Sequence, residues 1–212
     1  MRTERVELES ANGMRLAGEI DWPEAAPPLP AVVFSHGWGS GKCSPRNLVI
    51  AQRLAEAGLA ALRFDFTGHG DSSGTEADST WAQQVADLGA AVDFMLARPE
   101  VTRVGVAGAS TGGLVALRLA ARHEGVSALV LREPRSEGAE SYAHLILAPT
   151  LLLQGGRASP LRSDILRLAG LLRCPHRLVE IEGGGHLFED PATFEVVVEQ
   201  TVDWFAEHLR QP

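Results

Sequence analysis

Cysteine is scarce in this chain: its 212 residues include two, Cys43 and Cys174. No CxxC pair and no Cys/His spacing of a zinc module occurs. Two cysteines are too few for a disulfide framework, so we expect both thiols to be free in a reducing compartment. The sequence therefore implies no metal site and no organic cofactor.

Long apolar runs and an excess of positive charge are also missing. No stretch approaches the roughly 18 apolar residues that a membrane span needs, and Met1 to Glu9 lacks the apolar core of a secretion signal. Acidic residues outnumber Lys and Arg by 27 to 19, which gives a net charge of −8 without a basic stripe. We expect a cytoplasmic protein with no nucleic-acid or membrane partner; the sequence does not indicate an oligomeric state.

Strand-like and helix-like segments alternate along the chain. Residues 1–212 are enough for a single α/β domain with a buried core. The first 22 residues alternate in polarity around Asn12-Gly13, which predicts an antiparallel hairpin at a sheet edge. The further strands are predicted at Ala31–Ser35, Leu59–Phe66, Arg103–Ala109, Ser127–Leu131, Thr150–Gln154 and Arg177–Ile181. Helices are predicted at Pro45–Glu56, Thr80–Ala97, Gly112–Arg122, Ser163–Leu172 and Pro191–Leu209.

This alternation predicts a mostly parallel, eight-stranded sheet with helices on both faces. The connection from Arg132 to Pro149 is too short for a cap domain. It has room for one short helix, at about Ser141–Leu147, so we expect an open site.

A G-x-S-x-G pentapeptide, Gly108-Ala109-Ser110-Thr111-Gly112, lies between an apolar strand-like run and a helix-like run. This context is typical of a nucleophile elbow, a sharp turn that exposes a serine at the carboxyl end of its strand. Glycine at positions 108 and 112 removes the β-carbons that such a turn would bring into collision. Ser110 is therefore the candidate nucleophile.

A serine nucleophile needs a neighbouring base. His186, in a glycine-rich loop between the last strand and the last helix, would lie at the same sheet edge as Ser110. An oxyanion formed at the attacked carbonyl needs two N–H donors. We expect one from Thr111, the residue after the nucleophile. The other should come from Trp38 in His36-Gly37-Trp38-Gly39 after the third strand.

Together, Gly108–Gly112, His36–Gly39 and Gly185-His186 resemble the α/β-hydrolase superfamily, over residues 14 to 209. Ser44-Pro45-Arg46-Asn47 and the Gly-Ala-Ser-Thr-Gly elbow look most like its dienelactone-hydrolase-like esterases. The loop Asp65–Ser72 is similar to a D-x-x-G-x-G-x-S loop of many esterases in the superfamily, where it is structural more than catalytic. The resemblance implies hydrolysis of esters, lactones or related acyl compounds, without fixing the substrate.

The third member of the triad departs from the family pattern. The resemblance places an Asp or Glu after the strand Thr150–Gln154, where this chain has Ala158 in Gly155-Gly156-Arg157-Ala158. Three explanations are open. The acid was lost by design or in evolution, and the hydrolase is impaired. Alternatively, Glu133, after the preceding strand, replaces it, or Asp164 reaches back from the following helix.

The leading hypothesis is a serine hydrolase that cleaves small carboxylic esters or lactones through an acyl-enzyme on Ser110. Its activity would be reduced if Ala158 marks a lost acid. The alternative is a pseudoenzyme or binding protein that keeps the pocket without turnover. A peptidase of this fold usually carries an extra domain, for which the length leaves no room.

Overall fold

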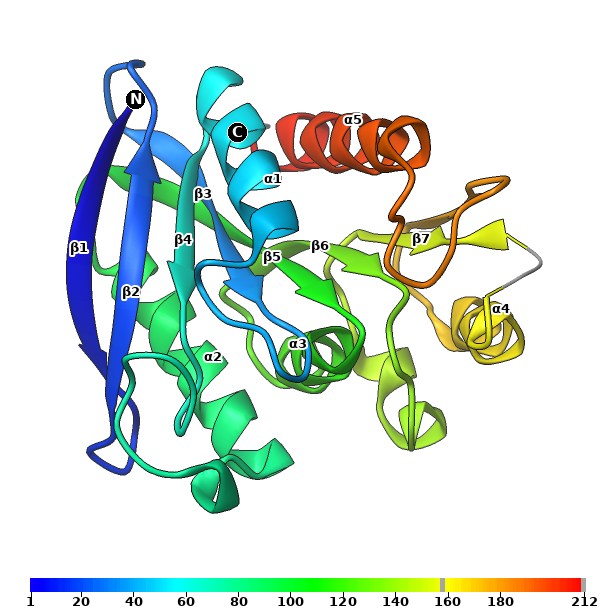
Figure 1. The fold of residues 1–212 in the computed structure, drawn as a ribbon, viewed down its shortest axis with the longest axis horizontal. Helices are drawn as coiled ribbons and strands as arrows, with labels where there is room; N and C mark the ends of the chain where they lie inside the picture. Colours follow the sequence, from blue (N-terminus) through cyan, green and yellow to red (C-terminus); the bar gives the residue numbers. More distant parts are fainter. Residues whose placement is uncertain (157–158, 211–212) are drawn as a thin grey trace.

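A computed structural model describes residues 1–156 and 159–210 of the chain. Its centre is an eight-stranded sheet in the order β1-β2-β4-β3-β5-β6-β7-β8 (Figure 1). The strands are β1 (Arg2–Glu9), β2 (Arg15–Trp22), β3 (Leu29–Ser35), β4 (Ala60–Phe64), β5 (Val101–Ala109), β6 (Val126–Arg132), β7 (Thr150–Gln154) and β8 (His176–Glu180). The predicted mostly parallel, eight-stranded sheet is confirmed.

The two amino-terminal strands form the predicted antiparallel hairpin at one edge of the sheet. β1 pairs with β2 from Arg2 opposite Trp22 to Glu9 opposite Arg15. β2 is antiparallel to β4, and every later pairing is parallel. Strands β3, β4 and β7 are buried along their whole length, as continuous apolar runs in a sheet covered on both faces should be.

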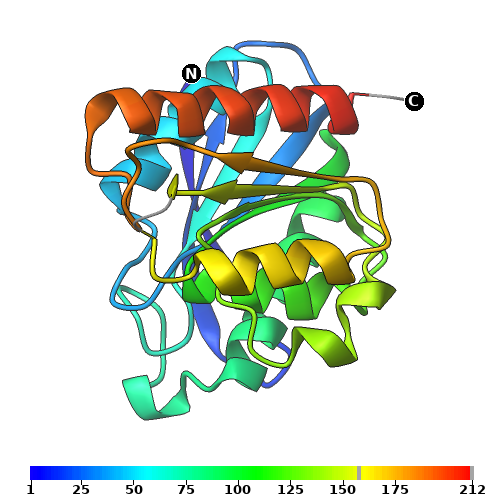
Figure 2. The same ribbon diagram turned by 90° about the vertical axis from the view of Figure 1, so that its right-hand side faces the viewer.

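The described residues form five α-helices, which cover the two faces of the sheet (Figures 1 and 2). Helices α1 (Pro45–Glu56) and α5 (Pro191–Leu209) pack on one face, and α2 (Trp81–Leu96), α3 (Thr111–Ala120) and α4 (Arg162–Leu171) pack on the other. Each face buries its own hydrophobic cluster. Ile50 and Phe205 belong to the first cluster, and Leu88 and Leu117 belong to the second. A short 3₁₀ turn, Glu76–Asp78, precedes α2.

The connection between β6 and β7 forms no α-helix, and the helix allowed for at about Ser141–Leu147 is a single 3₁₀ turn within those bounds. Two 3₁₀ turns, Ala139–Ser141 and Ala143–Leu145, stand in its place. Seven residues are too few to form a stable α-helix without a packed apolar face. Leu145 and Leu147 are 51% and 80% exposed, so Ala143 and Ile146 are the apolar residues that the segment from 141 to 147 buries.

The parallel arrangement brings the carboxyl ends of β3, β4, β5, β6, β7 and β8 to one edge of the sheet, where ligands of open α/β sheets bind. No helix among residues 1–156 and 159–210 is long and apolar enough to span a bilayer. Cys43 and Cys174 are free thiols, as expected.

Candidate active site

Ser110 occupies the sharp turn between β5 and α3. Its backbone has φ 51° and ψ −116°, a conformation that an L-residue adopts only under constraint from its surroundings. The constraint comes from the end of β6 and from the connection that follows it. The N–H of Ser110 donates to the carbonyl of Arg132 at 3.0 Å, and the N–H of Arg135 donates to the Ser110 carbonyl at 3.0 Å. The elbow is therefore held in place by backbone hydrogen bonds on both sides of the serine.

The glycines that flank Ser110 are required by close packing, as the sequence predicted. A β-carbon on Gly108 would lie 2.8 Å from the carbonyl oxygen of Gly112. A β-carbon on Gly112 would lie 2.1 Å from the carbonyl oxygen of Ser35, at the end of β3. Both distances are far below van der Waals contact with backbone that cannot move aside, so only glycine fits at these two positions.

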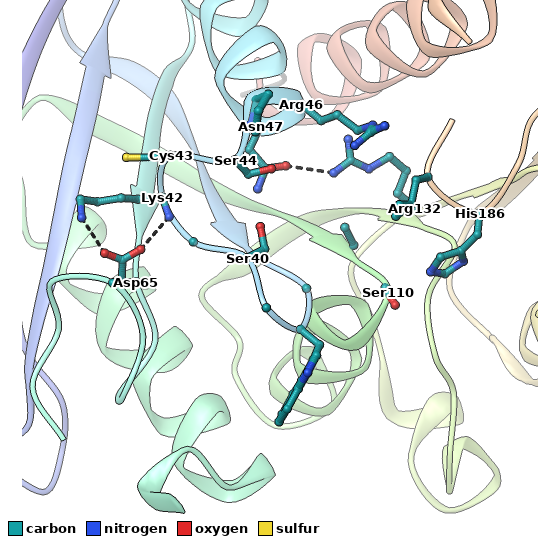
Figure 3. Close-up of a pocket in the computed structure, with 18 of the residues that line it drawn as sticks. Ser40, Lys42, Cys43, Ser44, Arg46, Asn47, Asp65, Ser110, Arg132 and His186 are labelled. Carbon is teal, nitrogen blue, oxygen red and sulfur yellow. Dashed lines mark hydrogen bonds and ion pairs between the residues drawn. The ribbon is translucent and has the colours of Figure 1, made fainter. Parts of the chain in front are cut away.

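His186 lies in the loop between β8 and α5, and its ring contacts a buried carboxylate. Its Nδ1 lies 3.3 Å from Oε2 of Glu133, which directly follows β6. Glu133 is only 1% exposed, whereas the His186 side chain is 32% exposed. The imidazole therefore has one nitrogen against the carboxylate, and it faces the same cavity as Ser110 (Figure 3).

The loop after β7, where the sequence suggested a missing acid, supplies hydrogen-bond donors to Glu133. The N–H of Gly155 donates to Oε1 and the hydroxyl of Ser159 donates to Oε2, each at 2.5 Å. Glu133 itself has φ 45°, and its N–H donates to the carbonyl of Leu153 on β7. These bonds stabilise a buried carboxylate, and they aim it at His186.

Two other positions were considered for the acid, Ala158 and Asp164. Ala158 lies outside the described residues. Asp164 belongs to the first turn of α4 and pairs with Arg167 on the surface. Among the three explanations for the acid, the geometry favours Glu133.

The two amides predicted to hold an oxyanion lie together beside Ser110. The N–H of Trp38 donates to the hydroxyl of Thr111 at 2.7 Å. The Thr111 amide is the first of α3, where helix N–H groups have no acceptor within the helix. An oxyanion at Ser110 would thus compete with the Thr111 hydroxyl for the Trp38 donor. Trp38 lines the cavity and is 64% exposed, so the cavity is open to solvent on this side.

His36 joins the loop that carries Trp38 to the loop after β4. It is 3% exposed; its Nε2 accepts from the N–H of Phe66 at 3.1 Å, and its Nδ1 lies 3.0 Å from the carbonyl of Gly37. Nε2 can accept only in the neutral ring, so Nδ1 carries the proton and donates to Gly37. Burial lowers the pKa of His36 to about 4, because a cation would lose its hydration there.

This neutral, buried histidine predicts a loss of stability in mild acid. The unfolded chain binds a proton on His36 near pH 6.5, whereas the folded protein binds it only near pH 4. The unfolded state therefore holds more protons in this range, and the free energy of unfolding should fall by about 3 kcal/mol between pH 7 and pH 4. Urea unfolding of the wild type and His36→Gln across this range measures the effect. An equally steep pH dependence in the variant would assign the loss to other groups.

Asp65 anchors the same region from the end of β4. Its carboxylate accepts from the backbone N–H and the ammonium group of Lys42, at 2.7 and 2.6 Å, and from the N–H of Asp71 at 3.0 Å. Lys42 also pairs with Asp71 at 2.6 Å. The Asp65–Ser72 loop thus has the structural role that the resemblance implied.

The Ser110 and His186 side chains open into a cavity of about 790 Å³ at the carboxyl edge of the sheet. Sequence reasoning did not single out two further groups here, namely Ser159 beside Glu133 and the cavity-lining Arg132. Their spacing in the chain carries no signal, because the contacts join segments far apart in sequence.

A central, mostly parallel sheet flanked by two helix layers, with the elbow at its carboxyl edge, defines the fold of the α/β hydrolases. Residues 26–154 match the family described as serine aminopeptidase, S33 (Hydrolase_4), and the chain belongs to this family.

Solved structures with the same fold include esterases. A dienelactone hydrolase from Anabaena variabilis is 31% identical, with a TM-score of 0.84 and 99% of each chain covered. The structure of Est1E from Butyrivibrio proteoclasticus with bound ferulic acid has a TM-score of 0.86 at 21% identity, covering 97% of this chain and all of that one. The expected resemblance to dienelactone-hydrolase-like proteins is confirmed.

Among curated sequences, a putative phosphoribosyl transferase of Mycobacterium tuberculosis is 33% identical over 215 residues. The match covers the whole of this chain and 48% of the relative, so the chain spans about half the length of that protein. The human mitochondrial palmitoyl-protein thioesterase ABHD10 is 31% identical over 102 residues, 48% of this chain and 32% of that protein. The relatives thus include esterases and a thioesterase.

Proposed function

We infer that this chain is a serine hydrolase that cleaves small carboxylic esters or lactones through an acyl-enzyme on Ser110. The observation that carries the proposal is the buried Glu133 carboxylate at 3.3 Å from Nδ1 of His186, in the cavity that Ser110 also lines. A carboxylate at Nδ1 fixes the tautomer that leaves Nε2 free to accept a proton, which is the arrangement that a serine nucleophile requires.

In the proposed reaction the Ser110 oxygen attacks the substrate carbonyl, and its proton passes to Nε2 of His186. The carbonyl electron pair moves onto oxygen, where the Trp38 and Thr111 amides donate to it. When the pair returns, the bond to the leaving alkoxide breaks, and the imidazolium protonates that alkoxide. Water then repeats the sequence on the acyl-enzyme, which releases the acid and restores Ser110. Glu133 stabilises the imidazolium during both steps.

A binding protein without turnover is the competing hypothesis, and it rested on Ala158. The contact between Glu133 and His186 speaks against it, because it offers His186 an acid whatever stands at position 158. The competing hypothesis still predicts that Ser110 is unreactive. Labelling by a fluorophosphonate probe at Ser110 separates the two.

Short acyl chains should be the preferred substrates. The β6–β7 connection forms only two 3₁₀ turns, and the Trp38 wall is mostly exposed, so little apolar surface can cover a long chain. Each buried methylene would contribute about 0.8 kcal/mol, so a deep pocket would show a steep rise with chain length. We expect p-nitrophenyl acetate and butyrate to have a higher kcat/KM than the laurate. A kcat/KM that climbs steadily to the laurate, or faster cleavage of aminoacyl p-nitroanilides, would contradict the proposal of a small-ester hydrolase.

A further inference from the structure

Three residues other than glycine have a left-handed backbone among residues 1–156 and 159–210. They are Ser110 with φ 51°, Glu133 with φ 45° and Phe188 with φ 50°. For a bulky side chain such a backbone is an outlier, and it persists only where the surrounding structure imposes it. The first two are the nucleophile and the acid of the proposed reaction, and Phe188 lies two residues after the proposed base, His186. Strained backbone thus accompanies all three segments that carry the proposed triad.

Phe188 closes the turn that carries His186. Its N–H donates to the carbonyl of Gly185 at 3.1 Å, which forms a β-turn with His186 in its second position. A preceding turn, closed by the N–H of Gly184 on the carbonyl of Ile181 at 3.1 Å, leads out of β8. The position of the His186 backbone therefore depends on where Phe188 is held.

The Phe188 side chain is anchored in the core. It is 1% exposed and belongs to the hydrophobic cluster between the sheet and helices α1 and α5. The ring packs on Gly184, where a β-carbon would lie 2.9 Å from the ring atoms Cδ1 and Cε1. The neighbouring Leu187 is 50% exposed. The turn is thus fixed to the core at Phe188, while its other large apolar side chain faces solvent.

The His186 ring has few contacts of its own that could fix its position. In the described part of the chain it is hydrogen-bonded to Oε2 of Glu133 alone, at 3.3 Å, and the side chain is 32% exposed. The backbone of the turn also packs on the loop after β7, because a β-carbon on Gly155 would lie 2.6 Å from the carbonyl oxygen of Gly185. The turn is therefore held between Gly155 and the Phe188 anchor, and a shift of its backbone would change the distance from Nδ1 to Glu133.

We propose that Phe188 is the positioning residue of the base: its buried ring and left-handed backbone hold the His186 turn so that Nδ1 meets Glu133 and Nε2 stays free for the proton of Ser110. The inference rests on the proposed function, and it adds a residue that does not line the cavity of Ser110. A misplacement of about 1 Å in a catalytic group can lower a rate about 100-fold, so such an anchor acts on kcat without touching the substrate.

Phe188→Leu tests the anchor. Leucine keeps an apolar side chain in the core but removes the ring that packs on Gly184, so the His186 turn should loosen. We expect kcat for p-nitrophenyl butyrate to fall by about 10- to 100-fold, with KM within about threefold of the wild type. The matched control is Phe205→Leu, which truncates a fully buried ring of the same cluster on α5. It should lower the melting temperature by a comparable amount and keep kcat.

Gly184→Ala reaches the same contact from the opposite side and guards against misfolding of the first variant. Its added β-carbon would meet the Phe188 ring at 2.9 Å, so the ring and the turn must shift. We expect kcat to fall in this variant as well, again with little change in KM. Gly170→Ala on α4 is the matched control: a β-carbon there would have nothing within 4 Å, so kcat should stay at the wild-type value.

The tautomer of the His186 ring makes the inference independent of turnover. A carboxylate at Nδ1 keeps the proton of the neutral ring on that nitrogen. Proton–nitrogen correlation NMR spectra of the imidazole rings, recorded in mildly alkaline buffer, distinguish the two tautomers. The wild type and both control variants should show His186 protonated on Nδ1, whereas Phe188→Leu should show a mixture of the two tautomers.

The two readouts separate the positioning role from the proposed function. A mixed tautomer in Phe188→Leu, together with a loss of kcat that Phe205→Leu does not share, supports the positioning role. If the wild type neither hydrolyses an ester nor is labelled at Ser110 by a fluorophosphonate, while the tautomer still depends on Phe188, the positioning role stands and the proposed function fails. A single tautomer in Phe188→Leu, or a loss of kcat no greater than that of Phe205→Leu in an active enzyme, overturns the positioning role alone.

Discussion

Ser110→Ala should reduce the hydrolysis of p-nitrophenyl acetate and butyrate to the uncatalysed background. Without the hydroxyl no acyl-enzyme forms. In subtilisin, removal of the catalytic serine alone lowers kcat by roughly 10⁶-fold. The fold should persist, because the elbow is held by backbone hydrogen bonds of residue 110 that alanine keeps. The measurement is steady-state kcat/KM, together with fluorophosphonate labelling followed by peptide mapping.

Ser40→Ala is the matched control for this variant. Ser40 lines the same cavity in the loop that carries Trp38, but the proposed reaction gives it no role. Its kcat/KM should stay within a few-fold of the wild type, and the probe should still label Ser110. Undiminished turnover in Ser110→Ala would refute the serine-hydrolase proposal, whatever the effect at Ser40.

The elbow could be predicted from sequence because its constraints are local. Gly108 and Gly112 lie two residues either side of Ser110, and the strand and helix that the turn joins are adjacent in the chain. Strand and helix bounds follow for a similar reason: the apolar runs are uninterrupted, and glycine, proline and polar residues end them. Helices Pro45–Glu56 and Pro191–Leu209 and strand Thr150–Gln154 have the predicted bounds, and the other predicted elements that the structure contains differ by at most two residues at either end.

The environment of Glu133 could not be predicted in the same way. A glutamate after a strand is usually solvated, and nothing local to Glu133 marks it as buried. Its burial depends on Gly155 and Ser159, which lie more than 20 residues further along the chain and supply two of its hydrogen bonds. Its backbone also has a positive φ of 45°, which is uncommon for a residue other than glycine. The sequence could therefore name Glu133 as one alternative but could not choose it.

For the loop that carries Trp38, the sequence predicts the location of a donor but not the contacts that the donor makes. The His36-Gly37-Trp38-Gly39 segment predicts where the second N–H donor lies, and the structure places that donor beside Thr111. The contact between the Trp38 amide and the Thr111 hydroxyl joins residues 73 positions apart. Sequence spacing predicts that these two loops share a sheet edge, but it does not specify which side-chain atoms meet there.

Glu133→Gln should lower kcat by about 10²- to 10⁴-fold with little change in stability. The glutamine oxygen can still accept from the Gly155 N–H, but its amide group would donate to Nδ1 of His186. That bond fixes the tautomer with the proton on Nε2, so the ring cannot take the proton of Ser110; an acid-to-amide change of this kind costs about 10⁴ in serine proteases. Thermal unfolding checks the fold, and Glu137→Gln, which removes an exposed carboxylate paired with Arg135, is the matched control.

Ala158→Asp supplies the opposite test of where the triad acid resides. If Glu133 already accepts from Nδ1 of His186, a carboxylate introduced at position 158 has no free imidazole N–H at Nδ1 to accept from. We therefore expect no gain in kcat/KM from Ala158→Asp in the wild type.

In the Glu133→Gln background, any recovery of kcat/KM on adding Ala158→Asp would show that the loop after β7 can still present an acid to the His186 ring. A gain approaching 10⁴-fold in the wild type, with Glu133→Gln fully active, would place the acid at residue 158 and make this chain an impaired hydrolase. If neither change matters, His186 acts on Ser110 without a carboxylate partner, and the role proposed for Glu133 is wrong.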